Sequence, residues 1–463
     1  GVRGALGRQT CPPRQARRNH VPHRVLPHLV PEVAGRGPAE GVPAGRGRRP
    51  RLRGAGHRDG GDGGVLSGGA VMSKNCVFFR AVLDDNKGDV LSQRNTELKN
   101  GNLAKNVFYL NLDSIRRVPG SPFTYWVSSG IIDKISNFPE LEDAGALVKV
   151  GMQTGDDFRF LRNFWEVSPQ KIKQREWIYY TKTDSAIPWY SPITLVVNWS
   201  DDGFEIKNLV DSKGKVRSAI RSPELYGRPG FSYMLRSTRL VPYIVPRDCI
   251  PTAGRSQVFP HRDLEVDALL LCSSNFGSAI ARFRGEKFGW PKFQASMVQS
   301  IPFKKLSQPS REYFKEIIFE KIQNARKNAS FDELSLEFVK FDQLAIQVTN
   351  ENNFSTFLGR TNEELFANEF GLSGSELAIL EHDLQEAVSL RADQFCEDDI
   401  SAPSAENIVG PSAFVSYAVG CILGRWDIRY ATGERQPPEL PDPFAPLPAC
   451  SPGMLQGEDG LPL

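Results

Sequence analysis

The chain has 463 residues, a formal net charge of +3 and 24% charged residues, which is enough length for roughly two to four domains. Residues 1–72 carry thirteen arginines against four acidic residues, so the remaining residues sum to a net charge of −6. A uniformly basic nucleic-acid-binding protein is therefore excluded, and any DNA-facing surface must be local. The seven cysteines never occur as CxxC, which predicts a reduced cytoplasmic protein without a structural zinc site.

Residues 1–72 are not expected to fold. They lack Lys, Ile, Phe, Tyr and Trp and are rich in Gly, Arg, Pro and Ala. Such a segment buries too little apolar surface to offset the entropy of the chain. It is either a basic, disordered nucleic-acid tail or a non-native reading frame. The abrupt change of composition after Met72 favours the second interpretation.

Residues 73–150 alternate short apolar runs with polar turns, which indicates a mixed α/β connector. Ile131–Leu141 predicts a short helix that breaks at Pro139.

Residues 151–310 are rich in strand formers and turn formers, and predict an irregular, mostly β domain. Thr194–Trp199 predicts a strand, and Phe204–Ile206, beyond an Asp-Asp-Gly turn, predicts the second strand of a hairpin. Ala268–Leu271 fits either a short helix or a strand.

Residues 311–431 predict a helical region. Its first amphipathic helix is marked by apolar residues at helical spacing: Phe314, Ile317, Ile318 and Ile322. Ser373 and Glu376 predict a capping box that begins another helix. Ala413–Leu423 is too short to span a membrane and predicts a packed helix. The overall expectation is an α+β chain with a disordered N-terminal segment.

The Pro-rich residues 432–463 predict an extended linker or an arm that follows the surface. The chain ends there without a closing element, as expected for a chain cut short.

Motifs for catalysis are missing from the sequence. GxGxxG, GxxxxGK[ST], HExxH and GxSxG do not occur, and His261 and His382 are the only histidines after residue 72. Paired carboxylates such as Asp201 with Asp202 stand in turn-like contexts that surface solubility explains. No residue is therefore assigned as catalytic, as cofactor-binding or as a metal ligand.

The segment from Tyr226 to Phe259 is the best functional signal. It interleaves arginines with aromatic, Gly and Pro residues, and no Asp or Glu interrupts the basic run before Asp248. Planar guanidinium groups among aromatic rings suit a surface that holds phosphates and touches base edges. For a single aromatic residue, a place in the core is the more frequent outcome. Counting the aromatic-basic run just upstream, the candidate DNA-binding residues are Lys182, Tyr190, Tyr226, Arg228, Arg236, Ser237, Thr238, Arg239, Arg247 and Arg255.

A family resemblance rests on motifs in a fixed order, namely FWEV, YYTK, PWYSPITLVVNW, YGRPGFSYMLRSTRL and PRDCIPTAGRSQVF. This order resembles the C-terminal part of large N6-adenine DNA methyltransferases, the PglX-type enzymes of BREX phage defence and fused type II restriction–modification enzymes. The resemblance covers residues 150–310 well. It implies that residues 151–310 form a target-recognition domain, that residues 311–431 form a helical spacer, and that residues 73–150 are the remnant of a methyltransferase domain or a connector.

The sequence also departs from this family. Its members carry a Gly-rich S-adenosylmethionine loop and an N-P-P-[YF] motif, whereas Pro437 and Pro438 here stand in RQPPEL without the Asn or the aromatic residue. Methyl transfer to a flipped adenine is therefore implied for the full-length family, while this chain is not expected to bind S-adenosylmethionine.

The leading hypothesis is a fragment of a site-specific adenine methyltransferase that contributes recognition of double-stranded DNA. The first alternative is a stand-alone DNA-specificity subunit that docks on a separate catalytic chain or on other subunits of a defence system. The second alternative is an interaction protein whose arginines bind acidic protein partners.

Overall fold

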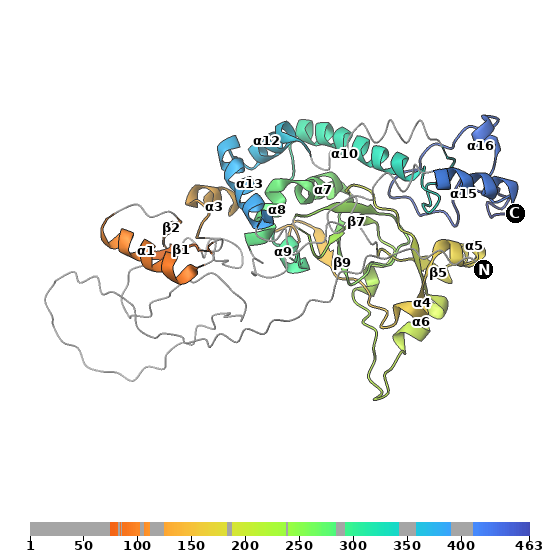
Figure 1. Cartoon of the computed structure of the whole chain (residues 1–463), viewed down its shortest axis with the longest axis horizontal. Helices are drawn as coiled ribbons and strands as arrows, with labels where there is room; N and C mark the ends of the chain where they lie inside the picture. Colours follow the sequence, from red (N-terminus) through yellow and green to blue (C-terminus); the bar gives the residue numbers. More distant parts are fainter. Residues whose placement is uncertain are drawn as a thin grey trace. The chain divides into compact units, whose positions relative to one another are not determined.

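The chain is an α+β protein in which small antiparallel sheets precede a mostly helical part, as expected from the sequence (Figure 1). The computed structural model describes residues 75–81, 84, 86–101, 106–111, 125–182, 188–237, 239–283, 292–341, 358–389 and 411–463. The predicted disorder of residues 1–72 lies outside the described residues, and so does Thr238.

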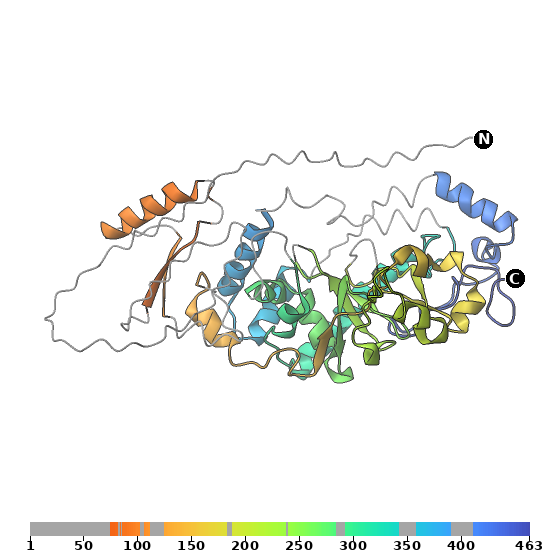
Figure 2. The ribbon, with the colours of Figure 1, turned by 90° about the horizontal axis from the view of Figure 1, so that it is seen from below.

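The first elements are the antiparallel strands β1 (Asn75–Phe79) and β2 (Val107–Asn111), which lie side by side in Figure 2, and the helix α1 (Lys87–Lys99) between them. The Phe78 ring stacks on Tyr125, with ring centroids 4.7 Å apart. The expected helix near residue 131 is present as α3 (Ser129–Ile135), shorter than the apolar run that predicted it.

A four-stranded sheet forms the centre of the described structure. Its order is β3 (Ala146–Lys149), β9 (Arg255–Pro260), β7 (Gly230–Met234) and β8 (Pro242–Val245), with every neighbouring pair antiparallel. Val258 of β9 pairs with Val148 on one side and with Phe231 on the other, and all are almost completely buried. Gly230 allows the close approach of β7 and β9, because a Cβ there would lie 2.1 Å from the Val258 carbonyl oxygen.

A second sheet of three strands has the order β4 (Leu161–Asn163), β6 (Leu195–Asn198) and β5 (Trp177–Tyr179). The predicted strand near residue 195 is therefore confirmed, but the predicted hairpin is wrong. The Asp-Asp-Gly segment has positive φ values of 50°, 54° and 69° and lies as a kink inside the short helix α6 (Ser200–Lys207), where the prediction had a second strand. The Trp199 indole N–H donates to Asp202, 3.2 Å away, which ties the ring to this turn.

The helical part packs against the four-stranded sheet and shares its core. The Ala268–Leu271 run is helical rather than extended. The longest helix, α10, buries Phe314, Ile318 and Ile322, as its spacing predicts. Ser373 and Glu376 form the predicted capping box: each backbone N–H donates to the other side chain, at 2.8 and 3.3 Å. The main helices are α7 (Glu265–Ser273), α8 (Asn275–Phe283), α9 (Ala295–Gln299), α10 (Gln308–Ala329), α12 (Arg360–Glu369), α13 (Gly374–Ser389), α15 (Pro411–Ile422) and α16 (Arg429–Thr432).

Short helical turns connect these elements. They are the α-helices α4 (Asp157–Phe160) and α5 (Pro169–Lys173), and the 3₁₀ turns η1 (Phe164–Glu166), η2 (Pro223–Leu225) and η3 (Arg262–Leu264).

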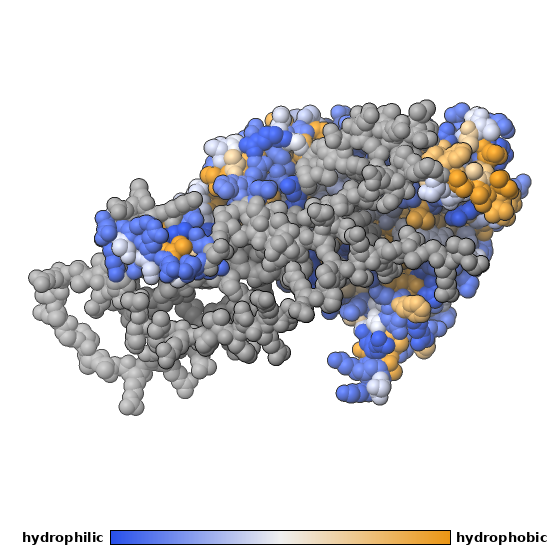
Figure 3. Space-filling model, in the orientation of Figure 1, coloured by the Kyte–Doolittle hydropathy of each residue, from blue (hydrophilic) through white to orange (hydrophobic). Residues whose placement is uncertain are grey.

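Helix α15 corrects one expectation. The run Ala413–Leu423 is helical up to Ile422, but it is not fully packed: Phe414 is 57% exposed, Ile422 83% and Leu423 77%, and this apolar surface is visible in Figure 3. Tyr417 packs beside Phe338, and the Phe414 ring contacts Phe341. In the described residues, no helix has both the length and the apolar character that crossing a bilayer requires.

The Pro-rich C-terminal residues lie against the rest of the chain rather than apart from it. The carbonyl oxygen of Pro448 accepts a 2.6 Å hydrogen bond from the Tyr179 hydroxyl, and that of Phe444 accepts one of 3.1 Å from the Arg247 backbone N–H. Segments more than 190 residues apart in the sequence are joined in this way.

A buried ion pair gives a first prediction about stability. Glu337 accepts hydrogen bonds from Arg326 at 3.1 Å and from the Tyr190 hydroxyl at 2.9 Å, and its side chain is 7% exposed. Glu337→Ala leaves a buried guanidinium without its counter-charge, so it should lower the free energy of unfolding by about 3–5 kcal/mol. Urea denaturation measures this loss. The exposed Glu316→Ala on α10 is the control, and equal stability of the two variants would contradict the prediction.

Candidate nucleic-acid interface

The antiparallel pairing of three strands brings arginines from distant parts of the sequence to one edge of the four-stranded sheet. Gly230, at the start of β7, pairs with Val245 at the end of β8, and Phe231 pairs with Val258 near the end of β9. Arg228 precedes β7 by two residues, Arg247 follows β8 by two, and Arg262 follows β9 by two, at the start of η3. Strand register therefore places them together.

These arginines line a cavity of about 620 Å³, whose lining residues are Arg228, Pro229, Arg247, Pro260, His261, Arg262, Glu265, Asp442 and Phe444. We call it the arginine cleft. The side chains of its three arginines are exposed, and in the described part of the chain none of them forms an ion pair within 4 Å. Arg228 lies over the Phe259 ring at 5.9 Å. Prolines and aromatic rings thus support guanidinium groups that are available to an anion.

The carboxylates of Glu265 and Asp442 also line the arginine cleft and reduce its net positive charge. Burial raises the pKa of Glu265, Asp442 raises it further, and Arg262 and Arg247 oppose the rise. His261 is turned toward Asp263, with Nδ1 2.6 Å from the carboxylate. Lys305 and His261 together lower the pKa of Asp263 to about 2. His261, although it lines the cleft, is thus paired with Asp263, and the excess positive charge of the cleft comes from the arginines.

Several predicted DNA contacts lie in the interior, which corrects the sequence-based list. Tyr190 is 4% exposed, and Arg326 covers its ring at 5.8 Å. Ser237 is 8% exposed, and Arg255 in β9 is 7% exposed. A buried ring or hydroxyl cannot stack on a base or meet a phosphate in this arrangement, so packing accounts for these residues.

Arg236 and Arg239, two of the predicted DNA contacts, differ in their surroundings. Arg236 is exposed. Arg239 instead turns inward and donates to Asn275 Oδ1 at 3.0 Å. Burial lowers the pKa of Arg239, while Glu363 and Glu381 oppose that shift. These acids come from α12 and α13, far away in sequence, and they supply the counter-charge that the neighbouring sequence lacks.

The remaining two candidates are at the surface but already engaged. Lys182 pairs with Asp157 at 2.6 Å, and the half-buried Tyr226 packs edge-on against Trp199 with centroids 5.8 Å apart. Arg228, Arg236 and Arg247 are the arginines of the predicted set that are exposed. Arg262 was missed because it lies outside the Tyr226–Phe259 segment, although the short loop after β9 holds it at the same sheet edge.

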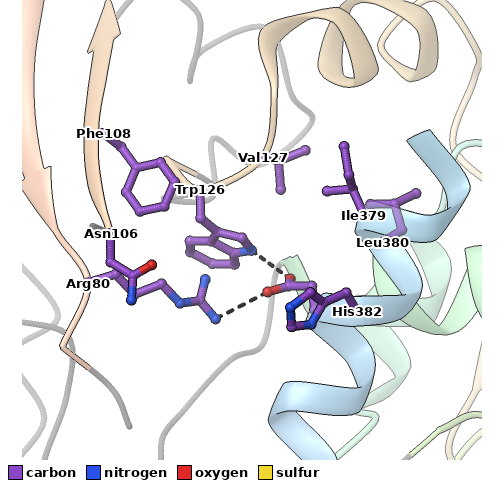
Figure 4. A pocket seen from close by; sticks show the side chains of 9 residues that line it. Arg80, Asn106, Phe108, Trp126, Val127, Ile379, Leu380 and His382 are labelled. Atoms are coloured by element: carbon purple, nitrogen blue, oxygen red, sulfur yellow. Dashed lines mark hydrogen bonds and ion pairs between the residues drawn. The ribbon is translucent and has the colours of Figure 1, made fainter. Parts of the chain in front are cut away.

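A second, smaller cavity of about 170 Å³ lies between the β1–β2 strands and α13 (Figure 4). Two charged residues that line it, Arg80 and Asp383, form an ion pair with each other. Asp383 pairs with Arg80 at 3.2 Å and accepts a 2.6 Å hydrogen bond from the Trp126 indole, while the Arg80 guanidinium lies 4.4 Å from the centre of that ring. This arrangement stabilises packing between the two segments and does not form a reactive site.

Reactive chemistry is not visible elsewhere in the described residues. Burial raises the pKa of the Cys249 and Cys272 thiols well above their usual range, so they are poor nucleophiles. Within the same residues, no group of three or more His, Cys, Asp or Glu side chains is placed to hold a metal ion. The arginine cleft can bind and orient an anion, and the described side chains around it supply no nucleophile.

Comparison with known proteins gives a distant relationship. The chain is 24% identical over 359 residues to the adenine-specific methyltransferase PglX of Lacticaseibacillus casei (strain Zhang), covering 72% of this chain and 28% of that protein. It is 25% identical over 208 residues to the adenine-specific methyltransferase BrxX of Escherichia coli O9:H4 (strain HS), covering 43% and 16%. No family model matches.

The chain is therefore distantly related in sequence to adenine-specific methyltransferases, and in particular to PglX and BrxX. The matches span little more than a quarter of PglX and less than a fifth of BrxX. A structure of the type IIL restriction–modification enzyme MmeI in complex with DNA overlaps 60% of this chain and 36% of its own, at 14% identity and a TM-score of 0.29. That score is too low to define a common fold.

Glu363, one of the two acids that act on Arg239, gives a prediction about how the stability of the fold depends on pH. Glu363 is 2% exposed and accepts both its hydrogen bonds, at 3.0 and 3.1 Å, from the Asn275 backbone N–H. Burial raises its pKa from 4.5 to about 7. The folded chain therefore binds this proton more tightly than the unfolded chain. The resulting stability is fully present below pH 4.5 and is lost as the pH rises through 7.

The Glu363→Gln variant has no ionisable side chain at this position, so its stability should lack this pH dependence. Between pH 5 and pH 8 the wild type should lose up to about 3 kcal/mol of unfolding free energy relative to the variant. Urea denaturation at both pH values measures the difference. Glu364→Gln, at a more exposed position on α12, is the control. The same pH dependence in wild type and Glu363→Gln would show that Glu363 is not the titrating group.

Proposed function

We propose that this chain binds duplex DNA as the target-recognition part of a PglX-type adenine-specific methyltransferase. The arginine cleft, in which three exposed guanidinium groups converge at one sheet edge, is the main support for this proposal. The sequence relationship to PglX and BrxX supports the kind of partner. Recognition of DNA is thereby assigned to this chain, and methyl transfer is not.

The cleft suits a phosphodiester backbone for two physical reasons. Arginine forks match phosphate oxygens in bidentate geometry, and their positive charge steers a polyanion from a distance. The described residues after 72 belong to a part of the chain with a net charge of −6, so a cluster of exposed arginines stands out as a local positive surface. Arg236, which follows the opposite end of β7, is also exposed and is a separate candidate contact in this proposal.

Neighbouring strands in the three described sheets are antiparallel, whereas nucleotide-type cofactors of this kind sit on a Gly-rich turn between a parallel strand and a helix. We therefore derive no step of methyl transfer from this chain. Its role in the proposal is to place a DNA site before a catalytic domain.

A binding assay with salt dependence tests the proposal. The 463-residue chain should shift a random-sequence 40-base-pair duplex at low salt and release it as salt rises, because bound phosphates release counterions. Arg228→Ala with Arg247→Ala should weaken binding and reduce the slope of log K against log[salt] by about two.

The charge-matched control is Lys315→Ala with Lys327→Ala, which removes two exposed cations from α10. It should leave both affinity and slope near those of the wild type. If the wild type fails to bind at low salt, the proposed function is wrong. If the arginine and lysine variants lose affinity equally, DNA binding is not located in the arginine cleft.

A further inference from the structure

Residues 208–218 form a narrow two-arm ribbon that leaves the surface after α6 and returns to it, and it projects from the neighbouring elements in Figure 1. Its arms are antiparallel. The Arg217 backbone N–H donates to the Leu209 carbonyl at 2.9 Å, the Asp211 N–H donates to the Lys215 carbonyl at 2.8 Å, and Val210 pairs with Val216. We call this element the basic ribbon.

The tip of the basic ribbon is held by its own hydrogen bonds. One carboxylate oxygen of Asp211 accepts from the backbone N–H groups of Lys213 at 2.8 Å and Lys215 at 2.9 Å. Gly214 supplies the left-handed turn with φ of 75°, a conformation that other residues rarely adopt. The only acid of the ribbon is therefore used to shape the turn, and the tip presents its lysines in a fixed geometry.

The base of the ribbon is fixed to the body. Ala219 and Gln153 exchange two backbone hydrogen bonds of 2.9 Å each. Gly155 packs so closely on this arm that a Cβ there would lie 2.8 Å from the Arg217 carbonyl carbon. A projecting element with an ordered tip and an anchored base can enter a groove without first paying the entropy of ordering a loop.

The two faces of the ribbon differ in chemistry. Side chains alternate between faces along an extended arm, and directly opposed residues share a face. Val210 and Val216 therefore share one face, where they are 51% and 50% exposed. Lys215 and Arg217 lie on the other face, and Lys213 is at the tip. Among the described residues, neither Lys213 nor Lys215 forms an ion pair.

We propose that the basic ribbon enters the major groove of duplex DNA, with its lysines on the flanking phosphates and its two valines against base edges. The dimensions agree, because paired strands lie about 4.8 Å apart and the major groove, about 12 Å wide, admits a two-stranded ribbon. Valine methyl groups are suited to contact the 5-methyl group of thymine, an apolar feature found only in that groove. This inference rests on the proposed function and adds a second, separate DNA contact to it.

An acidic protein surface is the competing partner for the lysines. It offers no reason for exposed valines on the opposite face of the same ribbon, whereas the major groove offers base edges to the valines and flanking phosphates to the long lysine side chains. The face chemistry therefore favours DNA.

The first test removes the lysines. Lys213→Ala with Lys215→Ala in the full chain should weaken binding to the random 40-base-pair duplex and lower its salt slope by about two, while Lys315→Ala with Lys327→Ala should not. Both pairs are exposed, so the variants should melt like the wild type. If the ribbon variant keeps the wild-type slope while Arg228→Ala with Arg247→Ala loses it, the ribbon inference is wrong and the proposed function stands.

The second test concerns the valines and the groove. Replacing thymine by uracil throughout the duplex removes the major-groove methyl groups, and wild-type affinity should fall about fourfold for each thymine methyl group that a valine touches. Val210→Ser with Val216→Ser should bind both duplexes alike and with an unchanged salt slope. If replacing thymine by uracil lowers the affinity of the wild type and of the valine variant equally, the valines do not contact thymine methyl groups and the placement of the ribbon in the major groove is wrong. Failure of the wild type to bind any duplex would overturn the proposed function itself.

Discussion

The antiparallel register of β7 with both β8 and β9 is the constraint on which the candidate site depends. It aligns the start of one strand with the ends of two others, so that Arg228, Arg247 and Arg262 lie together although the first and last are 34 positions apart in the sequence. The pairing is held by a core with Val258 and Phe231 almost fully buried, and by Gly230, which lets the backbones approach. A binding surface built on strand ends is rigid, which limits the entropy lost when an anion binds.

Much of the fold could be predicted from periodicity. The strand near residue 195, the apolar face of α10 and the Ser373–Glu376 capping box are local patterns, and the structure confirms them. The hairpin after Trp199 could not be judged in this way, because an Asp-Asp-Gly turn is compatible with a helical segment as well as with a hairpin, and here it lies inside α6. Local sequence specifies the turn but not the element that comes after it.

The candidate site was harder to predict because charge pairing is not local. Arg239 has no acidic neighbour in sequence, yet Glu363 and Glu381 reach it from α12 and α13. Tyr190 belongs to an aromatic run that suits stacking on bases, yet its hydroxyl meets Glu337 in the core. Two of the arginines that the sequence predicts as DNA contacts, Arg228 and Arg247, line the arginine cleft. Nothing in the sequence indicated Arg262, or the basic ribbon, whose faces depend on pairing between its arms.

In the proposed function, duplex DNA lies against the edge where β7, β8 and β9 converge. Hydrogen exchange of the full chain, measured with and without a 40-base-pair duplex, is the sharpest test of this contact. With DNA bound, exchange should slow at residues 227–230, 247–249 and 261–265 and stay unchanged in α10. Protection that spares these segments, or that is equally strong in α10, would show that DNA does not bind at this edge.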